Sequence, residues 1–183
     1  MIDEIRVQVI PEDQPRWLSF LNGQVDMAAG QYGPVPEGFI TQAMPNGKVA
    51  PNLAKQGIVG RSQLGSDLTF TYFNMEDPVV GGYTPDKVAL RRAIALGVDV
   101  DQEIRLARRN QAIPAQSPIG PQTWGFDPAF RSEMSLYDPA RAKALLDLYG
   151  YVDRDGDGFR ELPDGKPLTI EMATQPDQLT RKF

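Results

Sequence analysis

The chain contains neither cysteine nor histidine among its 183 residues. This absence excludes disulfides, thiolate nucleophiles, Ser-His-Asp triads, zinc fingers and histidine-liganded metal sites. The sequence also lacks a P-loop and a GxGxxG motif, so nucleotide binding through either motif is excluded. Any enzyme chemistry would have to rest on carboxylates, lysine, tyrosine or hard metal ions.

Long apolar runs and an excess of positive charge are absent as well. No apolar run approaches the ~20 residues of a membrane span, and the first residues, MIDEIRVQVIPED, lack the basic start and apolar core of an export signal. The formal net charge is −5, which argues against nucleic acid as a partner. The arginines between Arg105 and Asn110 are therefore interpreted as a solvated helix face.

Hydrophobic patterning predicts an α/β chain. Alternating apolar residues predict strands at residues 5–10, 24–28, 53–60, 67–75 and 167–173. Helices are predicted after Pro11, where Trp17, Leu18 and Leu21 share a face, and from Glu37 to Met44. Residues 5–28 thus have the order strand, helix, strand, which usually gives parallel pairing.

The second half is richer in helices and loops. One helix is predicted to start at the N-cap Thr84 and to face away from the core through Lys87, Arg91 and Arg92. A second runs from about Asp101 to Arg109. A third begins at the cap Asp138 and ends at Gly150, with Leu145, Leu148 and Tyr149 on its buried side. The change in composition near Asn74 predicts a boundary there, between residues 1–73 and residues 74–183.

Several segments, in this order, resemble one known family. They are IRVQVIPEDQPRWLSFLNGQVDMA, FTYFNMEDP, KVALRRAIALGVDVDQEI, AIPAQSPIGPQTWGFDP, YDPARAKALLDLYGYVDRDGDG and GKPLTIEMAT. The ordered set is similar to the family 5 extracellular solute-binding proteins of ABC transporters, which include oligopeptide, dipeptide and nickel binders. Members are much longer, so the resemblance implies an internal fragment of a two-lobed protein with the periplasmic-binding-protein fold. Residues 1–73 would belong to the first lobe and residues 74–183 to the C-terminal lobe.

The resemblance also implies a function and a site. Family members are not enzymes and need no cofactor. They close two lobes around a small-molecule or peptide ligand in the periplasm, or outside the cell while tethered to the membrane, and deliver it to an ABC permease. We expect a monomer. The matching cleft segments suggest ligand contacts at Ala29, Gly30 and Gln31, at Phe70, Thr71 and Tyr72, and at Trp124. The alternatives are that Phe70 and Tyr72 lie in the sheet core and that Trp124 packs under its own loop.

An Asp-rich stretch, YVDRDGDGFRELPDG, suggests calcium binding as a second functional class. Asp153, Asp155, Asp157 and Gly158 match the first six positions of an EF-type calcium loop, and Glu161 and Asp164 would supply positions 9 and 12. The closing residue is a short aspartate preceded by proline, and a strand rather than a helix is predicted afterwards. We therefore interpret the stretch as a turn and assign no metal site, with a calcium module as the alternative.

Carboxylates near Trp124 suggest a hydrolase as the remaining alternative function. Asp127, Glu133 and Asp138 are compatible with the paired acids of a carboxylate-dependent hydrolase. Asp138 is already accounted for as a helix cap. Neither this alternative nor the calcium module explains the ordered family segments.

Overall fold

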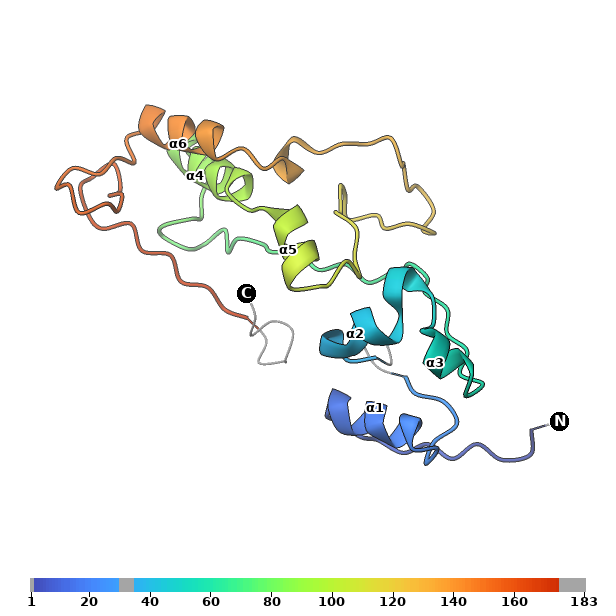
Figure 1. Ribbon diagram of the computed structural model, residues 1–183. Coiled ribbons are helices and arrows are strands. Elements are labelled where there is room, and N and C mark those ends of the chain that lie inside the picture. Colours follow the sequence, from blue (N-terminus) through green and yellow to red (C-terminus); the bar gives the residue numbers. More distant parts are fainter. Residues whose placement is uncertain (1, 30–34, 175–183) are drawn as a thin grey trace. The chain divides into compact units, whose positions relative to one another are not determined.

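The computed structural model describes residues 2–29 and 35–174 (Figure 1). The contacts within it divide the chain into two compact units, Met1–Gln63 and Leu64–Phe183. The boundary expected after residue 73 therefore falls inside the second unit. The assignment of the two parts of the chain to lobes stays a prediction.

The first unit is built from short helices. They are α1 (Asp13–Leu21), α2 (Glu37–Ala43), the 3-10 turn η1 (Pro45–Gly47) and α3 (Pro51–Ala54). Both predicted helices of this region form. The first of them, α1, ends just before Gly23, whose φ of +67° is the left-handed conformation that commonly terminates a helix.

The core of the first unit surrounds Trp17. Its side chain is only 5% exposed, and its ring stacks on Phe20 with a centroid separation of 5.5 Å. Ala43, Ala50 and Leu53 complete the buried cluster. Leu18, expected on the same face as Trp17, is instead 46% exposed. The buried indole thus helps to hold α1 against the following helices.

The second unit contains α4 (Pro85–Leu96), α5 (Val100–Leu106), the 3-10 turn η2 (Glu133–Ser135) and α6 (Pro139–Leu148). The Asp138 carboxylate caps α6 by accepting from the Arg141 amide at 2.9 Å. Thr84 occupies the predicted N-cap of α4, but its side chain makes no cap hydrogen bond. None of the helices in the described part of the chain is long and apolar enough to cross a membrane.

The two longest helices of this unit, α4 and α6, pack against each other (Figure 1). Small residues at the contact, Ala93 and Ala142, let the helices approach closely, and Leu96 fills the space beside them. The amide of Asp138 also donates to the carbonyl of Leu96 at 2.9 Å. The prediction that Leu148 is buried is wrong, because its side chain is 77% exposed.

The predicted strands are not formed among the described residues. Those residues contain one isolated antiparallel bridge, Glu161 with Pro167, and no strand. Residues 2–10 and 64–74 form neither helix nor strand and pair with no strand of the described residues, and Ile5, Val7 and Val9 are about four-fifths exposed, at 79%, 84% and 84%. A strand needs a partner to satisfy its backbone groups. The α/β assignment, and the parallel pairing within residues 5–28, therefore stay predictions.

Candidate functional site

A groove of about 620 Å³ lies within the second unit. It is lined by the segment that includes Phe70 and Thr71 and by α4. The loop around Gln116 and Ser117 also lines it. Two of the predicted contact residues, Phe70 and Thr71, thus line this groove.

The extended segment offers free backbone and aromatic side chains. In the described structure, no backbone amide from residue 65 to residue 73 donates a hydrogen bond to another group of the chain. The rings of Phe70 and Tyr72 lie on the same side, 6.1 Å apart and tilted by 47°. They are 67% and 80% exposed, so within this chain they are not buried in a sheet core. Unpaired extended backbone of this kind is a template for an added strand.

The wall formed by α4 is distinct from the face that packs on α6. Val88, Arg92 and Ala95 lie at helical spacing i, i+4 and i+7 and line the groove together with Arg91. Leu90 and Ala93 point instead into the core. The predicted direction of the arginines, away from the apolar stripe, is confirmed. The sequence analysis missed that this outward face is one wall of a groove.

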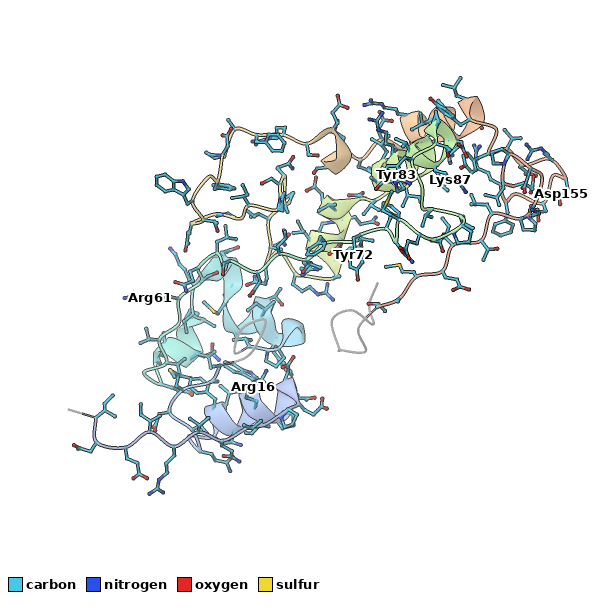
Figure 2. The ribbon with its side chains drawn as sticks, turned by 180° about the vertical axis from the view of Figure 1, so that it is seen from behind. Arg16, Arg61, Tyr72, Tyr83, Lys87 and Asp155 are labelled. Atoms are coloured by element: carbon cyan, nitrogen blue, oxygen red, sulfur yellow. The ribbon has the colours of Figure 1, made fainter. Side chains whose placement is uncertain are left out.

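The basic residues of α4 have different partners. Arg91 Nη1 donates to the carbonyls of Val80 at 2.6 Å and Gly82 at 2.9 Å. Lys87, labelled in Figure 2, donates from Nζ to the carbonyls of Pro78 at 2.8 Å and Val79 at 2.7 Å. These bonds fix the loop that leads from the extended segment into α4.

Arg92 differs from these two residues. Its side chain is exposed and makes no ion pair with a carboxylate of the described residues. Among the described residues that line the groove there is no aspartate or glutamate, whereas there are two arginines. In a chain with net charge −5, this local excess of positive charge favours an anionic group in the groove.

Among the other predicted contact residues that the structure describes, Tyr72, Trp124 and Ala29 do not line this groove. Trp124 is 98% exposed and does not line it, so packing of the indole under its own loop is wrong. Ala29 is exposed and belongs to the first unit. Gly30 and Gln31 lie outside the described residues. Their roles in binding remain predictions.

The Asp-rich loop forms a turn held by its own side chains (Asp155 is labelled in Figure 2). Asp153 accepts from the amides of Gly156 at 2.7 Å and Gly158 at 3.0 Å. Asp157 accepts from the Phe159 amide at 2.8 Å. These bonds are the Asx-type contacts that favour aspartate in turns. They support the interpretation of the stretch as a turn.

Four carboxylates of this turn also gather in one place. Asp153, Asp155, Asp157 and Glu161 each have an oxygen within 4.8 Å of the others. Glu161 is nearly buried and accepts from the Arg154 amide at 2.7 Å. Asp164, the expected closing residue, lies outside the cluster and pairs with Lys166 at 2.8 Å. The hydrogen bond from the Lys166 ammonium holds the pKa of Asp164 below its usual value.

The carboxylates near Trp124 have structural contacts of their own. Asp138 caps α6, and Asp127 accepts from the Ala129 amide at 2.8 Å. Glu133 lies 3.9 Å from a guanidinium nitrogen of Arg141. Each of the three acids thus has a contact with a group of the same unit.

Comparisons with known proteins found similarity to a family profile, to a curated protein and to a solved structure. The profile of the bacterial extracellular solute-binding proteins, family 5 Middle, matches residues 1–182. The chain is 34% identical over 101 residues to di/tripeptide-binding protein 2 of Pseudomonas aeruginosa (strain UCBPP-PA14), which covers 50% of this chain and 18% of the relative. It also resembles the crystal structure of NikA from Brucella suis in complex with Fe(III)-EDTA, with a TM-score of 0.55 and 23% identity, covering 88% of this chain and 29% of that one. The chain therefore spans less than a third of the length of either protein.

Proposed function

The chain belongs to the family 5 bacterial extracellular solute-binding proteins, and on this premise we propose that it is part of the solute-binding component of an ABC transport system. In this function the protein binds a solute outside the cytoplasmic membrane and delivers it to a permease. Binding shifts an equilibrium between open and closed forms, and no bond of the solute is made or broken. The match of the family profile over residues 1–182 is the observation that carries the proposal.

A peptide-type solute suits the groove best. The relative from Pseudomonas aeruginosa is a di/tripeptide-binding protein. The extended segment adds a physical reason, because free backbone amides beside exposed aromatic rings can pair with the backbone of an extended peptide. We propose Phe70, Thr71 and Tyr72 as contacts for such a ligand. Trp124, Ala29, Gly30 and Gln31 are proposed as further ligand contacts.

The affinity of this chain alone should be low. Binding sites normally bury most of the surface of a ligand, and this chain spans only 18% and 29% of two related proteins. We expect a Kd no tighter than about 1 mM, or about −4 kcal/mol.

Nuclear magnetic resonance of the 15N-labelled chain can test the function at this affinity. Di- and tripeptide mixtures should shift amide signals within residues 68–73, whereas the same amino acids as unlinked monomers should not. Equal shifts with free amino acids would contradict the peptide class. Calorimetry with the same mixtures provides a second check, since sub-micromolar binding would show that this chain alone is a complete site.

A further inference from the structure

We propose that Asn46 is a site of spontaneous deamidation, at which the chain converts this asparagine to aspartate and isoaspartate. Asparagine is followed by glycine at two places in the sequence, Asn22–Gly23 and Asn46–Gly47. The reaction needs water but neither a bound solute nor an enzyme, so it is independent of the proposed transport function. The backbone at the two places differs in a way that makes Asn46 the more reactive.

The reaction joins the side chain of Asn46 to the backbone of the next residue. The Gly47 nitrogen loses its proton and attacks Cγ of Asn46. A bond forms between these two atoms, the bond from Cγ to Nδ2 breaks, and the amide nitrogen takes up the proton and leaves as ammonia. Water then opens the cyclic imide. Opening at Cγ gives aspartate, opening at the main-chain carbonyl carbon gives isoaspartate, and nothing is oxidised or reduced. The two groups react readily because they belong to neighbouring residues.

The reacting groups of Asn46 and Gly47 are accessible. Both residues are exposed, and the Asn46 side chain makes no hydrogen bond with another residue that the structure describes. Glycine has no Cβ, and a Cβ built on Gly47 would meet no atom within 4 Å beyond its chain neighbours. The nitrogen that attacks is therefore not shielded by a side chain.

Local opening of the backbone controls the reaction. The Gly47 nitrogen has to turn toward the side chain by rotation about the Cα–C bond of Asn46. This rotation breaks two hydrogen bonds of the turn η1, from the Gly47 amide to the Met44 carbonyl at 3.1 Å and from the Lys48 amide to the Pro45 carbonyl at 3.2 Å. Bonds of the 3-10 type have poorer geometry than those of an α-helix, so this turn opens easily.

The same rotation at Asn22 would undo the end of α1. It would break the bonds from the Gly23 amide to the Phe20 carbonyl at 3.0 Å and from the Gln24 amide to the Ser19 carbonyl at 2.9 Å. These bonds are shorter than the two at Asn46, and they satisfy carbonyls of the last turn of the helix. Asn22 therefore opens less often.

The backbone angles of Asn46 add to this difference. Its φ of +54° and ψ of +33° are left-handed, a costly conformation for a residue with a Cβ unless its side chain bonds to nearby groups. Rotation releases this cost at Asn46, whereas Asn22, with φ of −83° and ψ of 3°, has none to release. We expect deamidation to be about fivefold faster at Asn46 than at Asn22, the factor that corresponds to about 1 kcal/mol.

Deamidation changes the connection between α2 and α3. Isoaspartate adds one carbon to the backbone of a turn whose ends are joined by the Ala50 amide, which donates to the Ala43 carbonyl at 2.8 Å. Both alanines are 4% exposed and belong to the core around Trp17. The first unit of the modified chain should therefore be less stable, and trypsin should cleave it faster after Lys48 or Lys55.

The test is to age the 183-residue chain in mildly alkaline buffer, once folded and once in guanidinium chloride. Chymotrypsin separates the two asparagines because Phe39 lies between them, and mass spectrometry measures the amide-to-acid conversion in each peptide. In the folded chain Asn46 should convert about fivefold faster than Asn22. In guanidinium chloride the two rates should be similar, because both asparagines precede glycine and no fold remains. Equal rates in the folded chain, or faster conversion of Asn22, would overturn the assignment. An Asn46 that stays intact in the folded chain after the denatured chain has converted would overturn it as well.

Two variants test the effect on the first unit. Asn46→Gly suits the left-handed backbone and has no side-chain amide, so the aged variant should keep its resistance to trypsin while the aged native chain loses it. Asn46→Asp introduces the charge without the extra backbone carbon and should stay close to the fresh native chain. Equal loss of resistance in the aged native chain and in aged Asn46→Gly would overturn the effect assigned to this site.

Discussion

The phenol of Tyr151 donates a hydrogen bond to the backbone carbonyl of Asp86 at 3.2 Å, although the two residues lie 65 positions apart. Tyr151 is completely buried and packs with Val80 and Leu90. The contact joins the first turn of α4 to the chain that follows α6. It therefore fixes the end of α4 from which the groove wall begins.

Removal of the hydroxyl should cost a measurable part of the stability of the second unit. Tyr151→Phe keeps the ring and loses the hydrogen bond, so we expect unfolding free energy to fall by about 1 kcal/mol. Tyr151→Ala also leaves a cavity and should cost about 3 to 5 kcal/mol. Tyr83→Phe is the matched control, since Tyr83 is 83% exposed (Figure 2). Urea denaturation followed by circular dichroism measures all three, and equal effects of the two Tyr→Phe changes would contradict the role of this bond.

Alkaline pH should weaken the same contact. Burial, together with the nearby Asp86 carboxylate, raises the pKa of Tyr151 above its ordinary value of 10.0. The folded chain thus keeps the phenol protonated where the unfolded chain ionises it. Stability should be fully present below about pH 10 and fall as the pH rises above it. Absorbance of tyrosinate should show one tyrosine ionising later than the others, and Tyr151→Phe should remove that late step.

The loop before α4 should not tolerate a side chain at Gly81. A Cβ built there would lie 2.5 Å from the carbonyl oxygens of both Asp77 and Met75. Backbone atoms cannot move aside as a flexible side chain can, so Gly81→Ala should destabilise by about 2 kcal/mol or more. Gly65→Ala is the control, because its nearest neighbour would be 3.8 Å away. Thermal melts that show similar losses for both variants would contradict the tight packing of this loop.

Limited proteolysis should cut before α4, between residues 61 and 73. This stretch is extended and spans the division between the two units, and residues 65–73 donate no backbone hydrogen bonds within the described structure. Trypsin should cleave after Arg61 before it cleaves at Lys87 or Arg92 in α4. Chymotrypsin should cut first after Phe70 or Tyr72. The loop of residues 74–82, although it has the composition of a linker, should resist because side chains of α4 hold its carbonyls. Early cleavage inside α4 would contradict this order, and mass spectrometry of the first fragments decides it.

Helices were predictable because their signals are local. Pro85 and Pro139 at first helical positions, Asp138 as a cap and the apolar spacing of Ala89, Leu90 and Ala93 all act within one or two turns. Pairing of strands depends instead on a partner that the alternation of Ile5, Val7 and Val9 does not specify. The strand predicted from this alternation therefore stays a prediction.

The candidate site was predictable only in part, because local signals in the sequence do not specify which distant residues come together. The family resemblance pointed to Phe70 and Thr71, and both line the groove. Arg92 was not predicted as a contact, because one exposed arginine on a helix resembles any solvated residue until the opposite wall is known. It is distinguished by lining the groove without an acidic residue among the described lining residues, which is a property of the three-dimensional arrangement.

Substitutions in the Asp-rich turn should affect stability differently, depending on whether they change its backbone conformation or one of its carboxylates. Gly158 has a φ of +92°, a conformation that alanine adopts only with strain. Gly158→Ala should therefore destabilise by about 1 kcal/mol or more. The Asp155 carboxylate accepts one hydrogen bond, from the Asp157 amide at 3.2 Å. An asparagine carbonyl can accept the same bond, so Asp155→Asn should be nearly neutral.

Calcium should change neither the loss of stability in Gly158→Ala nor the nearly neutral effect of Asp155→Asn. Asp164, which would have to close an EF-type site, pairs with Lys166 instead, and a metal would have to displace the backbone amides that Asp153 already binds. Thermal melts of the native chain and both variants, with excess calcium and with chelator, provide the measurement. A large rise in Tm with calcium that Asp155→Asn abolishes would show that the four gathered carboxylates form a metal site rather than a turn.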